Sequence, residues 1–387
     1  MNRQAALDGL RGCAILWVLA YHLIALPTRA AAYSGMPGLM AFAGYGWIGV
    51  NLFFVLSGYL ITQGLVSHER GRLSFLDFWV RRAFRIGPPY ALLLLSFVAA
   101  RALWPAGWPG ADRLFNSAIP FWSYLAFVQN LYMASLGYLG NDWLRVLWSL
   151  AVEMQFYVLI SVCVFLIPRR QLAWWLWSLA LGSVLLRYAC YFFVQNPDAS
   201  LVVLLPSRLD GFLLGGLLAI APRGEPGWPG FRRHAATVAV LLSSMAFLGL
   251  YSSGKFGGAT RYLVPLYNTV ISAGCVALLD LCASDFGPVR RLMELRPLVE
   301  AGRLSYFVYL FHMPIALALF YGVLGTAPAL GAPRAILLMA VVFAAIYGAA
   351  RLSYAFLEAP LIRRSHSLVR SAAGSATAGG QPPAPTG

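Results

Sequence analysis

The chain has 387 residues, of which 60% are hydrophobic and only 11% are charged, and its mean hydropathy is +0.69. This composition excludes an ordinary soluble domain and indicates a membrane protein. The net charge of +15 comes from arginines scattered between hydrophobic segments, a distribution that argues against nucleic-acid binding. The 5 cysteines lie in apolar stretches without CxxC spacing, so we expect neither a disulfide framework nor a metal site.

Segments of about twenty apolar residues, the length that crosses the hydrocarbon core of a bilayer, recur along the chain. They are predicted at 12–31, 45–66, 83–104, 146–167, 172–194, 203–221, 234–253, 262–283, 304–325 and 334–357. The stretch 117–135 is short and interrupted, which favours a re-entrant or interfacial helix over a further crossing. The expected fold class is all-α, a polytopic membrane bundle of about ten transmembrane helices. We expect this domain to cover residues 1–370 and to be followed by a disordered tail over 371–387, which is rich in small residues, Gly and Pro.

The basic residues of the loops predict the orientation. Most loop arginines fall on the side of the N-terminus, whereas the opposite loops hold only Arg29, Arg113, Arg145, Lys255, Arg261 and Arg334. By the positive-inside rule, we expect a multi-pass protein of the cell membrane with both termini and the tail in the cytoplasm. Asp8 and Arg11 crowd the first apolar run, so that run is expected to remain as an uncleaved anchor.

Two ionisable residues lie on the first predicted helix. Arg11 and His22 are separated by a spacing that places them on one helix face, about 16 Å apart along the axis. An ionisable group without a partner in hydrocarbon costs several kcal/mol. For this reason a functional role is favoured for His22 over the role of a buried structural histidine.

Four further polar residues are predicted at the depth of His22, about 8–11 Å below the outer boundary, when each span is counted from its outer end. They are Asn51, Glu153, Arg208 and Asp210. A carboxylate such as Glu153 in an apolar run needs a proton, a histidine or an arginine as its partner. Simpler interpretations stay open: Arg208 and Asp210 pair with each other, and Asn51 forms an interhelical hydrogen bond.

Two other groups lie nearer the cytoplasmic side. Arg81, Arg82 and Arg85 fall within one turn in FWVRRAFRIGPPY, at the start of the third span. They either surround a phosphate, which suits bidentate arginine contacts, or anchor the helix to anionic lipid headgroups. His312 is counted about 12 Å from the inner boundary, and is therefore expected in a different layer from His22; a structural and a substrate-lining role are both open.

Seven segments occur in a fixed order along residues 7 to about 362. They read LDGLRGCAILWVLAYH, GVNLFFVLSGYLIT, FWVRRAFRIGPPY, LWSLAVEMQFY, SRLDGFLLGGLLA, LSYFVYLFHMPI and FLEAP. Together they resemble the acyltransferase 3 family, integral membrane O-acyltransferases of bacterial polysaccharide decoration, Nod-factor modification and macrolide tailoring. The resemblance implies a ten-helix core that passes acyl groups, usually acetyl, from cytoplasmic acyl-CoA to a hydroxyl.

The resemblance also implies roles for single residues. His22 matches the proposed catalytic histidine and Arg11 its partner; Arg81, Arg82 and Arg85 match an arginine motif linked to donor binding; Glu153 matches an acidic residue of the fourth segment. The second segment commonly reads GVDLFFVLSG in this family, and here Asn51 stands at the aspartate position. Glu153 or Asp210 would then have to orient the histidine.

We therefore expect residues 1–370 to form an acyltransferase domain that uses acyl-CoA as donor and has no permanently bound cofactor. The expected acceptor is a hydroxyl of a sugar-containing molecule, either a macrolide antibiotic or a cell-surface glycan. His22 is expected as general base with Glu153 beside it, the CoA contacts come from Arg11, Arg81, Arg82 and Arg85, and the substrate contacts come from Asn51, Arg208 and Asp210. Two alternatives stay open: an acyl-enzyme on Ser57 or Ser149, which no nucleophile-elbow pattern supports, and a membrane transporter or flippase, for which no internal repeat is visible.

Overall fold

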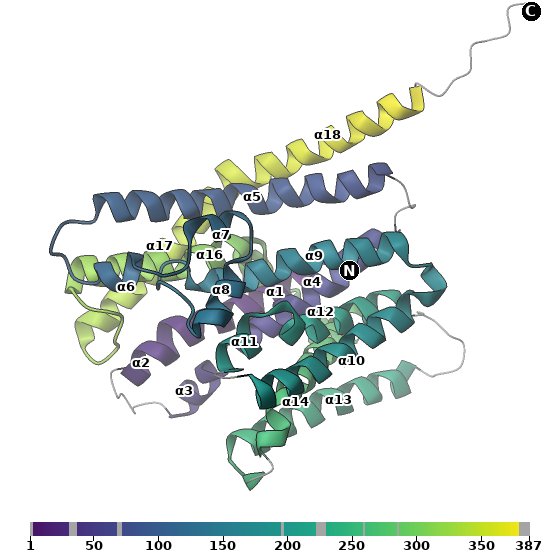
Figure 1. Ribbon diagram of the computed structural model, residues 1–387, viewed down its shortest axis with the longest axis horizontal. Helices are drawn as coiled ribbons and strands as arrows, with labels where there is room; N and C mark the ends of the chain where they lie inside the picture. The colour runs from purple at the N-terminus through teal and green to yellow at the C-terminus, as the bar shows by residue number, and fades with distance from the viewer. Residues whose placement is uncertain are drawn as a thin grey trace, which may run out of the picture.

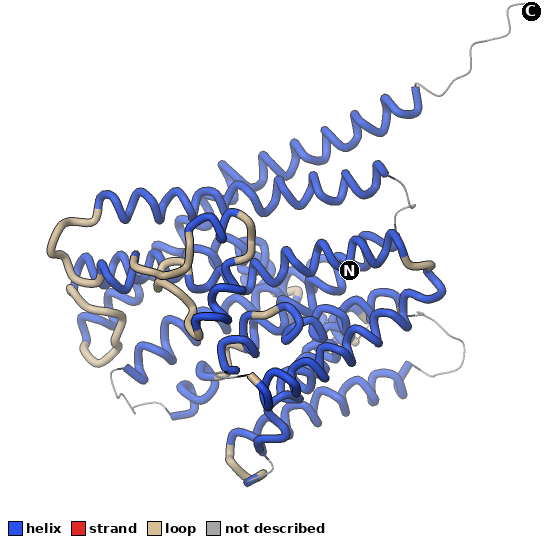
Figure 2. Tube along the Cα trace, viewed as in Figure 1, coloured by secondary structure: helices blue, strands red, loops and turns tan. Residues whose placement is uncertain are grey.

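The computed structural model describes residues 3–30, 37–67, 72–194, 197–221, 230–257, 260–284 and 286–378. Within these ranges every regular element is a helix, and loops join them (Figure 2). Ten helical segments of the described chain are long and apolar enough to cross a membrane. The predicted fold class, a polytopic helical bundle, is therefore confirmed.

The elements differ in length, and several short helices separate the long ones. In order they are α1 (Arg3–Leu19), the π-helix η1 (Ala20–Ala25), α2 (Leu26–Ala30), α3 (Pro37–Gly44), α4 (Ile48–Ser67), α5 (Arg72–Leu103), α6 (Ala111–Phe115), α7 (Phe121–Leu125), α8 (Gln129–Leu136), the 3₁₀ turn η2 (Arg145–Leu147), α9 (Trp148–Leu166), α10 (Arg169–Phe193), α11 (Pro197–Val203), α12 (Leu205–Ile220), α13 (Gly230–Ser252), α14 (Thr260–Ala283), α15 (Gly287–Met293), α16 (Arg296–Leu324), α17 (Pro333–Ser353), the π-helix η4 (Tyr354–Glu358) and α18 (Ala359–Ala378).

The long helices run side by side and give the bundle two ends (Figure 1). Helices α6, α7 and α8 gather at one end, which we call the cap end. Helices α1 and α5 begin at the opposite end of the bundle, which we call the N-terminal end. The stretch 117–135, predicted not to cross the membrane, forms α7 and most of α8 in the cap, and none of the ten candidate spans includes it.

Helices α1 and α16 pack with their backbones in contact, because glycines stand where they meet. A Cβ atom added to Gly12 would lie 2.0 Å from the carbonyl oxygen of Leu298, and one added to Gly302 would lie 1.7 Å from that of Asp8. Small residues allow this approach between membrane helices. The two helices run in the same direction, so α1 presents one side to α16 over most of its length.

The last helix is longer than the sequence indicated. Helix α18 continues to Ala378, past the predicted end of the folded domain at residue 370. Residues 371–378 are therefore helical rather than disordered, in keeping with their alanine content, since alanine is the strongest helix former. The rest of the predicted tail, 379–387, lies outside the described residues.

Candidate active site

Three arginines line a narrow cavity inside the bundle. The cavity measures about 100 Å³ and is bordered by α1, α4, α5, α9 and α16. Arg11, Arg82 and Arg85 line it together, whereas Arg81 lines a neighbouring cavity that shares Arg82. Arg11 and Arg85 also border a wider cavity of about 410 Å³, which includes Gln4 near the start of α1. These two arginines thus stand where a wide space at the N-terminal end meets a narrow one deeper in the bundle.

Glu153 of α9 faces the same narrow cavity. Its Oε1 accepts a hydrogen bond of 2.5 Å from the Ser57 hydroxyl and another from the Tyr157 hydroxyl. The Arg82 guanidinium lies over the Tyr157 ring, 5.6 Å from its centre. The structure therefore brings Glu153 to the arginines, and none of its described hydrogen bonds involves His22.

A pair of hydroxyl groups borders the cavity on its cap side. The Ser149 and Tyr309 hydroxyls are 2.5 Å apart, and that of Tyr309 also donates to the carbonyl oxygen of Val146 at 3.2 Å. Both residues line the cavity. Tyr309 stands one helical turn before His312 on α16, with the two ring centres 6.0 Å apart.

His22 meets a second histidine. The ring centres of His22 and His312 are 5.0 Å apart. In each ring Nδ1 bonds to a backbone carbonyl: that of Val18 at 3.1 Å for His22, and that of Tyr309 at 2.8 Å for His312. A carbonyl oxygen only accepts, so Nδ1 carries the proton in both rings and each Nε2 is a base. The buried Nε2 of His312 has no hydrogen-bond partner in the described part of the chain.

The separate layer predicted for His312 is thus wrong. Helix α16 begins at Arg296, not at 304, so His312 lies about 24 Å along it, toward the cap end. His22 is carried on the π-helix η1, an element that often marks functional sites. The predicted shared face of Arg11 and His22 is consistent with the structure, since Arg11 lines a cavity together with residues of α16 and His22 contacts His312 of α16.

The single polar layer predicted around His22 is divided in the structure. Gly49 of α4 lies against Ala14 of α1, and α4 runs from there toward the N-terminal end. Asn51, buried on α4, consequently lies level with the Arg11 half of α1, not with His22. The predicted depths were counted from the outer end of each span and assumed that all spans end at the same level. The contact between Gly49 and Ala14 shows that they do not.

Asp210 forms a buried ion pair with Arg187, so the alternative in which Arg208 and Asp210 pair with each other is wrong, whereas the substrate contacts expected from both residues stay a prediction. Arg187 donates to the two carboxylate oxygens of Asp210 at 2.9 and 2.7 Å, and Thr269 donates to one of them at 2.5 Å. These contacts join α10, α12 and α14. Arg208 bonds instead to Asn268 at 2.6 Å and lies over the Trp148 ring.

Sequence reasoning missed Arg187 and the role of the tyrosines. Arg187 is a lone arginine in the apolar run 172–194, which by itself signals a buried partner. Tyr157 and Tyr309 follow Glu153 and precede His312 by one turn, so helix spacing could have found them. No local pattern indicated that the two histidines meet.

Comparisons with known proteins identify a family and several relatives of the chain. A family model described as "Acyltransferase domain" matches residues 4–351, in line with the resemblance of the seven segments. "O-acetyltransferase OatA" of Staphylococcus aureus (strain NCTC 8325 / PS 47) is 27% identical over 379 residues, covering 92% of this chain and 57% of that protein. The "Putative membrane-bound transacylase BcsY" of Komagataeibacter xylinus is 29% identical, covering 81% of this chain and 73% of its own length.

A further relative is the "Putative peptidoglycan O-acetyltransferase YrhL" of Bacillus subtilis (strain 168), 29% identical and covering 80% of this chain and 48% of that protein. The chain thus spans little more than half the length of the Staphylococcus aureus relative it matches. No solved structure matches the chain at a significant level.

Proposed function

The chain belongs to the acyltransferase domain family, and we propose that it is a membrane O-acyltransferase that transfers a short acyl group, such as acetyl, from acyl-CoA to a hydroxyl of a glycan. The observation that carries this proposal is the cavity that runs from Arg11, Arg82 and Arg85 to the hydroxyls next to the histidine pair. Two of the relatives are named as O-acetyltransferases, one of them for peptidoglycan, which favours a glycan over a macrolide as acceptor.

The charge and size of the two cavities support acyl-CoA as the donor. The wide cavity of about 410 Å³ is bordered by Arg11, Arg85 and Arg303 and by the carboxylates of Asp8 and Glu358, of which Asp8 pairs with Arg11 at 3.3 Å. The arginines outnumber the carboxylates there, and arginine binds phosphate groups in a bidentate manner. The inner cavity, at about 100 Å³, is much smaller than the wide one. We therefore propose that the phosphates of CoA remain near the arginines while the pantetheine arm carries the thioester inward.

His22 is proposed as the general base. Its Nε2 removes the proton of the acceptor hydroxyl as the oxygen attacks the thioester carbonyl; the carbon–sulfur bond then breaks, and the CoA sulfur leaves and takes up that proton. His312 is proposed as a positioning residue: its ring packs against that of His22, with 5.0 Å between the ring centres, and holds the base in place. This is the service that Glu153 was expected to give.

Glu153 is proposed to serve the donor side. A carboxylate next to three guanidinium groups offsets part of their repulsion, and its bond to Tyr157 holds the ring on which Arg82 rests. Direct transfer is preferred over an acyl-enzyme, because the described hydrogen bonds of Ser57 and Ser149 do not involve a histidine, the base that usually activates a nucleophilic serine.

The proposal is tested with the purified full chain in lipid vesicles. Labelled acetyl-CoA is supplied with an N-acetylglucosamine tetrasaccharide in one sample and with a macrolide in another. We expect label on the saccharide only, at a rate that depends on the acetyl-CoA concentration. Movement of unlabelled saccharide across the vesicle membrane without acetyl-CoA consumption would indicate a transporter instead.

A further inference from the structure

A second hollow lies at the cap end, away from the arginine cavity. It measures about 670 Å³, within the range of about 300–1,000 Å³ typical of sites for small molecules. Its walls come from the end of α5, from α6, α7 and the loops around them, and Leu144 lines it just before η2. We call this hollow the cap groove.

The cap groove combines aromatic rings with polar groups. Phe97 and Phe121 line it with their rings stacked, 6.0 Å between centres, and the Phe121 side chain is exposed. Arg101, Ser117 and Asn141 supply polar atoms to the same walls. None of the ion pairs in the described ranges involves Arg101.

One polar group in the groove lacks the partner that burial demands. Tyr124 lines the groove and is 1% exposed, yet its hydroxyl has no hydrogen-bond partner among the described residues. A buried hydroxyl without a hydrogen-bond partner carries an uncompensated desolvation cost. A group kept at such a cost in the wall of a hollow is a sign of a bound molecule that supplies the missing bond.

The walls are held in place before any ligand binds. Arg113 and Asp142 join α6 to the loop before η2 through an ion pair at 3.0 Å and a backbone hydrogen bond at 2.8 Å. Tyr138 accepts a hydrogen bond of 2.8 Å from the Ala118 backbone on the other side. A preformed site of this kind binds without the entropic cost of ordering its loops.

We propose that the cap groove binds the saccharide chain whose hydroxyl is acylated, an inference that rests on the proposed function. Sugar rings present C–H faces that pack on aromatic rings, and hydroxyl edges that both donate and accept hydrogen bonds. The Phe121 ring provides a surface for the C–H faces, and Tyr124 and Arg101 provide hydrogen-bonding groups for the hydroxyl edges. A lipid tail would fill the same volume but leave the Tyr124 hydroxyl and the arginine unpaired.

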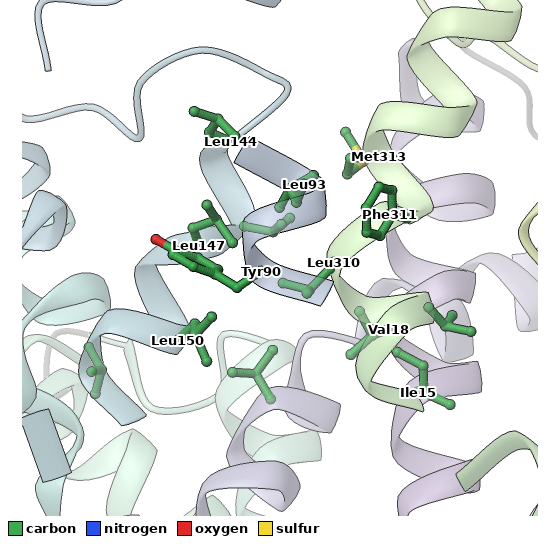
Figure 3. Close-up of a cluster of buried hydrophobic side chains, with 14 of the residues drawn as sticks. Ile15, Val18, Tyr90, Leu93, Leu144, Leu147, Leu150, Leu310, Phe311 and Met313 are labelled. Atoms are coloured by element: carbon green, nitrogen blue, oxygen red, sulfur yellow. The ribbon is translucent and has the colours of Figure 1, made fainter. Parts of the chain in front are cut away.

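The position of the groove suits this role. Leu144, its inner wall, belongs to the apolar cluster that also holds Leu93 and Met313 (Figure 3). Leu150 and Leu310 of the same cluster line the donor cavity, so the groove and the donor cavity border one apolar layer. Val146, two residues after Leu144, accepts a hydrogen bond of 3.2 Å from the hydroxyl of Tyr309, one turn before His312. Donor and acceptor therefore approach the histidine pair from opposite ends of the bundle.

The test measures binding of an N-acetylglucosamine tetrasaccharide to the purified full chain by calorimetry, without acyl-CoA. We expect Tyr124→Phe to weaken binding about 2- to 10-fold and Arg101→Gln about tenfold, as expected for the loss of one neutral and one charged hydrogen bond. Arg334→Gln, at the start of α17 and outside the groove, is the matched control and should bind like the unchanged protein. The unfolding midpoint of Tyr124→Phe should not fall, because the hydroxyl it removes has no internal partner.

Two results would overturn the inference. One is unchanged saccharide binding in both groove variants; the other is a co-purified phospholipid that mass spectrometry finds in the unchanged protein but not in the variants, with no saccharide bound. Because binding is measured without donor, it is separable from catalysis. Saccharide bound through Tyr124 and Arg101 but never acylated would contradict the proposed function and leave the groove assignment standing.

Discussion

Buried charges occur in both halves of this bundle, but they are arranged differently. In the half built from α10, α12 and α14, Asp210 takes its bonds from Arg187 and Thr269, and the three helices are tied together. In the half built from α1, α5, α9 and α16, three arginines face a cavity and Glu153 is the one carboxylate that lines it with them. A charged group matched within the protein serves the fold, whereas an unbalanced set beside a cavity is available to a ligand.

The largest effect is expected from His22→Ala, in the half with the cavity. Transfer should fall about 10²- to 10⁴-fold, the usual contribution of a general base, while the unfolding midpoint stays close to that of the unchanged protein. The measurement is the rate of labelled acetyl transfer in vesicles. His234→Ala, a histidine on α13, is the control, and near-normal transfer by His22→Ala would refute the base assignment.

Asp210→Leu, in the other half, should change the stability of the fold and not the transfer rate per folded molecule. Leaving Arg187 buried without its carboxylate should lower the free energy of unfolding by about 3–5 kcal/mol, as measured by denaturation in detergent. Arg187→Leu in the same chain should restore much of this stability, because both charges are then gone. Transfer per folded molecule should survive in the double variant; if it is lost, Asp210 acts in the reaction, as the sequence had suggested.

His312→Ala should slow transfer about 10- to 100-fold through kcat, with little change in KM for acetyl-CoA. The double variant with His22→Ala should be no slower than His22→Ala alone, because His312 acts only through His22. Additive losses in the two single variants would mean that His312 has an independent or merely structural role.

The smallest effect is expected when Arg85 and Arg81 are replaced, and its size should differ between the two arginines. Arg85→Gln should raise KM for acetyl-CoA about tenfold, since a lost charged hydrogen bond is worth about 1.5–3 kcal/mol. Arg81→Gln should raise it less, because Arg81 lines the adjoining cavity and not the one that holds Glu153. Equal effects would favour headgroup anchoring for the whole cluster.

The fold class could be predicted because each membrane span is encoded by residues that follow one another in the sequence. Each membrane span is a continuous apolar run, and composition alone located ten of them. The shared face of Arg11 and His22 was equally accessible, since it depends on the geometry of a single helix.

The relative heights of helices could not be predicted in the same way. The level of Asn51 follows from the contact between Gly49 and Ala14, and no pattern within either segment encodes it. The meeting of His22 with His312 depends on where α16 begins, and arginines at its start concealed the first turns of that helix from an apolar count. The partner of Asp210 is Arg187 on a different helix, α10, and a search for partners close to Asp210 in sequence overlooked it.

The glycine contacts between α1 and α16 have a consequence for how the enzyme is made. Helix α1 leaves the ribosome before α16, and the helices from α2 to α15 are synthesised between them. His22 is therefore made before its partner helix, and the histidine pair forms only after α16 has packed against α1. An unfinished chain thus lacks the histidine pair, and the site proposed for acyl transfer is completed only after α16 has inserted.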